Sequence, residues 1–163
     1  MISHSRLGPA VSALALGFVV TLGGCDTSAD EMLISAESFE QGVAKDSEGG
    51  AFRVVLSTPA GFDEGLRVGE NTLIVRLGFH DPDDPFAPGH GIPAAEVQLD
   101  AWMPSPQGSG GSVDGLRGVH VGDGRYEITG LTLPEPGVWQ LDFALAIGEN
   151  VDDSVSFAFV ISD

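Results

Sequence analysis

The chain has 163 residues, which fits one ordinary domain, and its 23 glycines and 10 prolines favour short strands and tight turns over long helices. Its 24 acidic and 7 basic residues give a formal net charge of −17 at pH 7. Such a surface repels phosphate backbones, so nucleic acid is excluded as a partner, whereas cationic partners and metal ions stay open.

Residues 1–24 have the pattern of an export signal. A short first part with one positive side chain, Arg6, is followed by an apolar stretch from Ala10 to Leu22 and then by small residues. The apolar stretch is too short to cross a membrane stably. We therefore expect this segment to be removed and leave it out of the fold.

Cys25 ends the sequence Leu22-Gly23-Gly24-Cys25, which resembles the lipobox of bacterial lipoproteins. The resemblance implies a diacylglyceryl group on the thiol, cleavage before Cys25 and a membrane anchor of two or three acyl chains. An ordinary secretory signal with a chance cysteine is the alternative, but Cys25 is the only cysteine and so has no disulfide partner. Asp26 resembles an inner-membrane retention signal that fails in some lineages, so the choice of membrane stays open.

Residues 25–50 are rich in small and polar side chains without a sustained period, which predicts a flexible tether with at most a frayed strand or turn. From residue 51 to residue 163 the chain alternates apolar and polar residues, as half-buried strands do. The expected inward rows are Phe52, Val54 and Leu56; Leu73, Val75, Leu77 and Phe79; Val97, Leu99 and Ala101; Val119 and Val121; Tyr126 and Ile128; Trp139, Leu141, Phe143 and Leu145; and Val155, Phe157, Phe159 and Ile161.

Six or seven short strands with no helical stretch among them predict an all-β fold, a two-sheet antiparallel sandwich of immunoglobulin-like kind. A loose Gly/Ser segment is expected from Gln107 to Ser112, and Gly122-Asp123-Gly124 predicts a tight turn. We expect Trp139 to be a core residue rather than a binding platform.

Several short motifs resemble the YtkA-like domain and are similar also to the FixH-like proteins of cytochrome oxidase assembly. They are Gly69-Glu70-Asn71-Thr72-Leu73-Ile74-Val75, Pro93-Ala94-Ala95-Glu96-Val97, Met103-Pro104, Gly122-Asp123-Gly124-Arg125-Tyr126 and Pro136-Gly137-Val138-Trp139-Gln140-Leu141. The resemblance runs from about Ala51 to Ile161, and its motifs are mostly turns and strand starts. It therefore speaks for the fold more than for an activity.

Metal binding rests on few side chains. Many relatives of this kind carry methionines and histidines suited to copper after the Met-Pro pair, and another methionine before the Pro-Gly-x-Trp step. Here Met103-Pro104 is followed by Ser105 to Ser109, and Glu135 takes the place of the second methionine. Four residues, His80, His90, Met103 and His120, could still converge on copper; otherwise they are surface and turn residues. Asp81, Asp83 and Asp84 could offer oxygens to calcium, but Pro85 and the lack of an EF-hand pattern favour a solvated turn.

The sequence carries no signature of an enzyme. It has no Gly-x-Ser-x-Gly elbow and no His-Glu-x-x-His helix, and Glu127 stands where a dinucleotide loop would need its third glycine. We expect a non-catalytic accessory or interaction module, exported and held at a membrane of the cell envelope by lipid on Cys25. Its partner would contact an exposed strand edge or the segment from Met103 to Gly118; the alternative is a periplasmic copper-binding protein linked to oxidase assembly.

Overall fold

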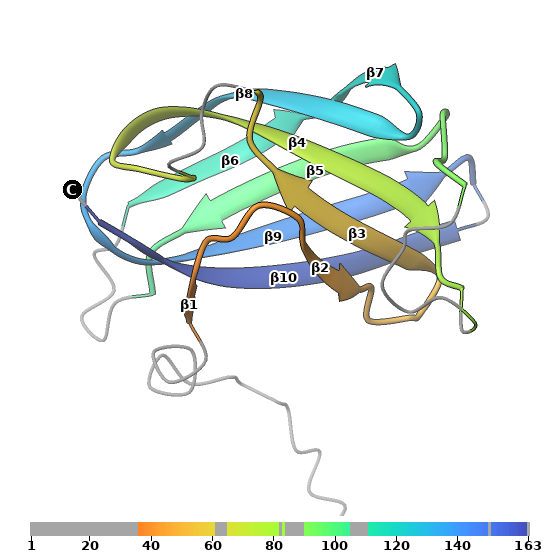
Figure 1. Ribbon diagram of the computed structural model, residues 1–163, viewed down its shortest axis with the longest axis horizontal. Coiled ribbons are helices and arrows are strands. Elements are labelled where there is room, and N and C mark those ends of the chain that lie inside the picture. Colours follow the sequence, from red (N-terminus) through yellow and green to blue (C-terminus); the bar gives the residue numbers. More distant parts are fainter. Residues whose placement is uncertain are drawn as a thin grey trace, which may run out of the picture.

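The protein is a sandwich of two five-stranded sheets, seen in a computed structural model that describes residues 36–60, 65–81, 83, 90–104, 111–149 and 151–162 (Figure 1). The first sheet has the order β1-β10-β9-β5-β6 and the second the order β2-β3-β4-β8-β7. The strands are β1 (Glu37–Ser38), β2 (Val43–Asp46), β3 (Phe52–Ser57), β4 (Gly69–Phe79), β5 (Glu96–Trp102), β6 (Ser112–Arg117), β7 (Val119–Gly122), β8 (Arg125–Leu133), β9 (Gly137–Ile147) and β10 (Val151–Ile161). The predicted all-β two-sheet fold is confirmed.

The alternating rows of the sequence face one another across the space between the sheets. Every second residue is buried in β3 and β5, from Trp139 to Leu145 in β9 and from Val155 to Ile161 in β10, because successive side chains of a strand point to opposite faces. Apart from β1, which runs parallel to β10, all neighbouring strands are antiparallel. The largest fully buried side chains include Trp139, Tyr126, Phe52 and Phe143, and so the prediction that Trp139 is a core residue is confirmed.

Two buried aromatic side chains also hold loops by hydrogen bonds. The Trp139 indole N–H donates to the Glu135 carbonyl at 3.0 Å. The Tyr126 hydroxyl donates to the Ile92 carbonyl at 2.6 Å and accepts the Ala95 amide at 2.9 Å. Buried polar groups need such partners, and these bonds fix the chain as it enters β5 and β9.

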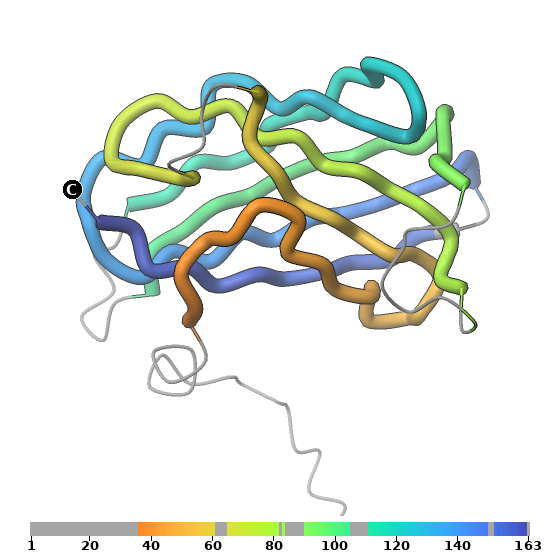
Figure 2. The backbone as a smooth tube through the Cα atoms, viewed as in Figure 1, coloured from red at the N-terminus to blue at the C-terminus, as the bar shows by residue number. Residues whose placement is uncertain are grey.

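The sandwich begins earlier than the sequence predicted. Residues 25–50 were expected to form a tether, but β1 pairs with β10 and β2 pairs with β3. Figure 2 shows the orange segment that carries both strands lying on the same side of the molecule as β10. These two strands are too short and too polar to show an alternation of their own, and their partners order them instead.

Three apolar side chains are more exposed than expected. Phe79 keeps the inward parity of its row and stacks on Phe52 with 6.4 Å between ring centroids, yet it is 56% exposed because it ends β4 at the margin of the core. Val119 and Val121 are 67% and 50% exposed, and the expected inward row is wrong here, because the register pairs His120 with the buried Tyr126 and Val119 with Glu127 on the outer face, and it shifts after His120.

Strand β6 was not predicted at all. Its register with β5 shifts between Leu99 and Ala101, and Gly115 has a φ of +71°, as in a bulge. A strict period of two would place Val113 and Leu116, three residues apart, on opposite faces, whereas the bulge turns both toward the core, so the segment shows no alternation in the sequence. The described residues contain no helix long and apolar enough to cross a membrane.

Candidate functional site

The four candidate copper ligands are held in four different surroundings. His80 follows β4, and its Nδ1 lies 3.0 Å from Asp46 Oδ1, an oxygen that also accepts Arg53 at 2.9 Å. His120 lies on β7, at the opposite edge of the same sheet from β2, with its ring 5.2 Å from that of Tyr126. His80 is thus paired with a carboxylate, and His120 covers an aromatic ring.

Met103 and His90 are equally separate. The Met103 side chain packs against the margin of the core, and its Cε would be 3.0 Å from a Cβ placed on Gly137. His90 is exposed beside Arg76 and Arg125. Within the described ranges, no three side chains of the His, Cys, Asp and Glu types are grouped as metal ligands would be. Copper binding stays a prediction that this geometry does not favour.

Two other expected sites fall partly or wholly outside the described residues. Asp81 Oδ1 accepts the backbone amide of Asp83 at 2.9 Å, which is the local bond of a turn, and Asp84 lies outside. Cys25, the expected point of lipid attachment, lies outside as well. The calcium site and the lipid attachment at Cys25 therefore both stay predictions.

Asp153 joins the two sheets along the side of the sandwich where β2 and β10 meet. Its carboxylate accepts the Ser47 hydroxyl at 2.5 Å and the backbone amides of Gly49, Ala51 and Ser154 at 2.8, 3.2 and 2.8 Å. Burial acts to raise the pKa of Asp153, but these donors outweigh it, so the pKa lies below its ordinary value of 3.8. The carboxylate is therefore a structural clamp, held in its charged form.

Further contacts seal the same side. Lys45 Nζ reaches from β2 to the Ser156 carbonyl at 3.0 Å, and the Glu48 amide donates to the Ser154 carbonyl at 2.8 Å. Phe39 stacks edge-on against Phe159 with 5.2 Å between ring centroids. We call this the sealed side.

Asp46 is the second carboxylate whose pKa is displaced. A hydrogen bond from Arg53 lowers the pKa most, burial raises it, and the bond from His80 lowers it again, with a net result below the ordinary value. The Asp46 and Arg53 side chains face each other from paired positions of β2 and β3. Their role is again to hold strands together.

The other side of the sandwich is open. There β6 and β7 are the last strands of the two sheets and follow each other in the chain through Gly118. All three side chains from Val119 to Val121 are exposed. The outer side of an edge strand presents backbone N–H and C=O groups that pair with no other strand, and here exposed apolar side chains lie beside them. We call the run from Ser112 to Gly122 the open edge.

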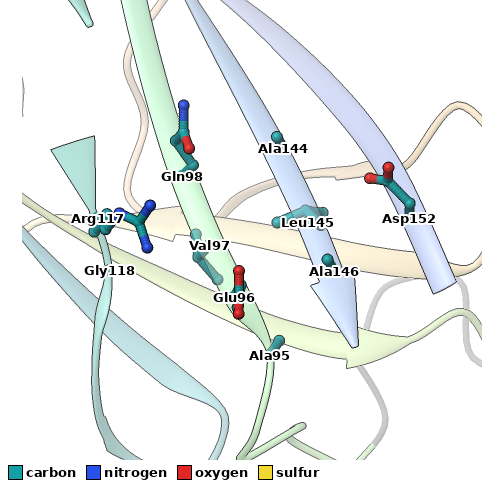
Figure 3. A pocket seen from close by; sticks show the side chains of 10 residues that line it. All are labelled: Ala95, Glu96, Val97, Gln98, Arg117, Gly118, Ala144, Leu145, Ala146 and Asp152. Atoms are coloured by element: carbon teal, nitrogen blue, oxygen red, sulfur yellow. The ribbon is translucent and has the colours of Figure 1, made fainter. Parts of the chain in front are cut away.

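A hollow of about 240 Å³ adjoins the open edge on the outer face of the first sheet (Figure 3). Ala144 and Ala146 of β9 form its low floor, since their Cα partners on β5 are Gln98 and Glu96 and the alanine side chains are short. Arg117 of β6 stands at one margin, and Asp152 of β10 stands at the other, as Figure 3 shows. The hollow offers polar contacts of both signs next to the apolar edge.

The open edge was only partly foreseen. The segment from Met103 to Gly118 was expected to contact a partner, and its described part contains β6. The exposed valines of β7 were placed in the core instead, because a Val-His-Val run favours the valines for the inward face, whereas the register pairs His120 with the buried Tyr126 and Val119 with Glu127.

Comparison with known proteins gives one match. A family model described as YtkA-like matches residues 46–144, from the end of β2 into β9. The match begins five residues before the expected domain start at Ala51 and so includes the end of the sealed side. No curated protein and no solved structure matches the chain.

Proposed function

The chain belongs to the YtkA-like family, and on that premise we propose that it is a non-catalytic binding module of the cell envelope. In this proposal the module holds a partner protein along the open edge. The polypeptide itself is exported and anchored to a membrane through lipid on Cys25. The partner contributes an extended segment that adds a strand beside β7.

One observation carries the proposal: β7 is an outermost strand whose side chains Val119 and Val121 are 67% and 50% exposed. Natural proteins usually protect sheet edges with charge, proline or a covering segment, because an uncovered edge pairs with other chains. Here the four residues of β7 include no Asp, Glu, Lys, Arg or Pro, and no strand of the described part of the chain pairs with its outer side. Strand addition uses such an edge, with the backbone giving affinity and alternate side chains giving specificity.

The neighbouring charges support the same surface. The hollow beside the edge holds Glu96, Arg117 and Asp152, which can give a partner polar contacts around an apolar centre. Protein interfaces have this arrangement of an apolar core and a polar rim. On the sealed side β1 and β2 are also outermost strands, but β2 carries Lys45 and Asp46, and Lys45 and the Glu48 amide bind carbonyls of β10.

The anchor is supported by the sequence Leu22-Gly23-Gly24-Cys25 and by the absence of any second cysteine. Intact-mass measurement of the chain recovered from the membranes of a bacterium that makes it tests this part. We expect a mass that begins at Cys25 and includes a diacylglyceryl group. A membrane-free product of unmodified mass, or a Cys25→Ser chain that stays in the membrane fraction, would contradict the anchor.

The edge is tested by two matched substitutions in the full chain, Val119→Lys and Val160→Lys. Both valines are exposed, but Val160 lies on β10 and at 45% exposure faces away from the open edge. Envelope proteins that crosslink to each variant in cells are compared by quantitative mass spectrometry. We expect Val119→Lys to lose a protein that Val160→Lys and the unchanged chain retain; equal capture by all three would refute the proposed edge.

A further inference from the structure

The outer face of the second sheet brings two arginines together in a chain that has few of them. Arg76 of β4 and Arg125 of β8 are direct Cα partners on neighbouring antiparallel strands. Directly opposite side chains have Cβ atoms about 5 Å apart, and like charges in that position repel each other. With 24 acidic residues and only 7 basic ones, this arrangement leaves a local positive charge on an acidic protein.

The two arginines are only partly neutralised. Arg125 lies 3.4 Å from Asp123 Oδ2, and its Nε donates to the Gly122 carbonyl at 3.4 Å. Arg76 forms no ion pair with any described residue, and Glu127, the next outward position of β8, lies within ion-pair distance of neither arginine. By contrast Arg53, on the same face, is paired with Asp46 at 2.9 Å.

His90 and the backbone complete the surroundings. Arg76, His90, Gly91, Asp123 and Arg125 together line a hollow of about 550 Å³. Two guanidinium groups and one imidazole supply N–H donors from three separate segments of the chain. Among the described residues that line the hollow, Asp123 is the one with a carboxylate, which would repel an anion, and its side chain is 83% exposed.

The backbone of this hollow is fixed by close contacts. Gly91 bridges to Gly78, the Ile92 amide donates to the Leu77 carbonyl at 3.0 Å, and the Leu77 amide donates to the Gly124 carbonyl at 2.8 Å. A Cβ at Gly91 would lie 2.2 Å from the Asp123 carbonyl oxygen, so glycine is required for this approach. The segments that carry the three donors are therefore held in place before any ligand arrives.

We infer that Arg76, Arg125 and His90 form a binding site for a small oxyanion of the phosphate type, which adjoins the end of the open edge at Gly122 but does not depend on the proposed partner. A guanidinium group binds phosphate oxygens through two parallel N–H donors, and a second guanidinium compensates the remaining charge. Bound phosphate also removes the repulsion between the paired arginines. The same chemistry fits free phosphate or the phosphate of a lipid headgroup.

Calorimetric titration of the full chain in nonionic detergent with inorganic phosphate at low ionic strength tests the site. We expect one saturable site, and at least a tenfold weaker affinity in Arg76→Gln and in Arg125→Gln, because each loses a charge-assisted bond. The control Arg117→Gln removes the same charge from β6 and should change the affinity less than about twofold. Circular dichroism melting of each variant shows whether the chain is still folded.

A substitution that should strengthen phosphate binding makes the test stricter. Asp123 sits in the tight turn with a φ of +51°, a conformation that asparagine tolerates, so Asp123→Asn should leave the turn intact. It removes the carboxylate that competes with the ligand, and we expect phosphate to bind several-fold more tightly. The control is Asp114→Asn on β6, with an expected change of less than about twofold.

Phosphatidylglycerol doped into the detergent micelles identifies the source of the phosphate. Displacement of bound phosphate assigns the site to a lipid headgroup, and no displacement assigns it to a soluble oxyanion. The inference is overturned if no saturable binding occurs up to roughly 10 mM phosphate, where a millimolar site would be nearly filled. Equal affinity in Arg76→Gln, Arg125→Gln and Arg117→Gln would overturn it as well.

Discussion

The two sides of the sandwich are closed by different means, and the difference separates stability from binding. On the sealed side, Asp153 and Lys45 form hydrogen bonds from one sheet to the other. On the open edge the sheets are joined through Gly118, whose amide donates to the Val97 carbonyl at 2.9 Å, and the valines of β7 face solvent. The layers are therefore held by side-chain hydrogen bonds on one side and by a close glycine crossing on the other.

Glycine allows the open edge to pass so close to the core. A Cβ at Gly118 would lie 3.0 Å from Tyr126 Cβ and 3.2 Å from Val97 Cβ. The chain therefore crosses from β6 to β7 directly over two core residues without a covering side chain. Beyond the crossing, pairing with β8 holds β7 in its sheet.

Removal of the clamp should have the largest effect on stability. Asp153→Ala removes the acceptor of three backbone amides and leaves the hydroxyl of the buried Ser47 with only the Phe52 carbonyl, at 3.3 Å. We expect the free energy of unfolding to fall by about 2 kcal/mol, measured by urea denaturation. The neighbouring exposed Asp152→Ala is the control, with an expected change below about 0.5 kcal/mol. Equal losses would show that the clamp contributes nothing specific.

The corresponding polar contact near the open edge should matter less. Tyr126→Phe removes a single hydroxyl and so deprives the Ile92 carbonyl and the Ala95 amide of one shared partner. We expect a loss of about 1 kcal/mol in the same denaturation experiment, since the ring itself still fills the core. A loss larger than that of Asp153→Ala would reverse the ranking of the two sides.

Acid should act on the sealed side first. The pKa of Asp153 is lower in the folded chain than its ordinary value of 3.8, so its contribution to stability is present above that value and is lost as the pH falls through the folded pKa. Stability should therefore decline below about pH 4. Asp153→Asn should weaken this decline, while Asp152→Asn should retain it. Identical acid profiles for both variants would contradict the assignment.

The smallest effect on stability is expected at the open edge. Val119→Lys replaces a side chain that is 67% exposed, so the free energy of unfolding should change by less than about 0.5 kcal/mol. Thermal melting measures this directly. A large loss would mean that β7 supports the fold, and that lost partner capture reports unfolding rather than a blocked edge.

The sequence predicted the core rows better than the edges, for a physical reason. Val97, Leu99 and Ala101 alternate because the same face of β5 is covered along its length, and all three are buried as predicted. The exposure of Val119 depends on the register of β7 with β8, which pairs it with Glu127 on the outer face and which local alternation does not reveal. The positions of β1 and β2 likewise depend on β10 and β3 rather than on their own residues.

The candidate sites show the same limit. The spacing of Arg76 and Arg125 along the chain carries no signal, because only the register of β4 with β8 makes them partners. The four expected copper ligands could be named from their chemistry, but the topology places His80 and His120 in different surroundings. The sequence identifies residues that could bind a ligand, whereas only the strand order and register show which of them lie close together.

Amide hydrogen exchange of the full chain tests the contrast between the two sides most directly. Every amide from Ser47 to Ala51 donates a hydrogen bond, which is unusual for a turn, whereas β7 has a neighbour on one side only. We predict that these turn amides exchange more slowly than the amides of β7 that do not pair with β8. If all amides of β7 exchange as slowly as those of the turn, the claim that one side is open and the other sealed is contradicted.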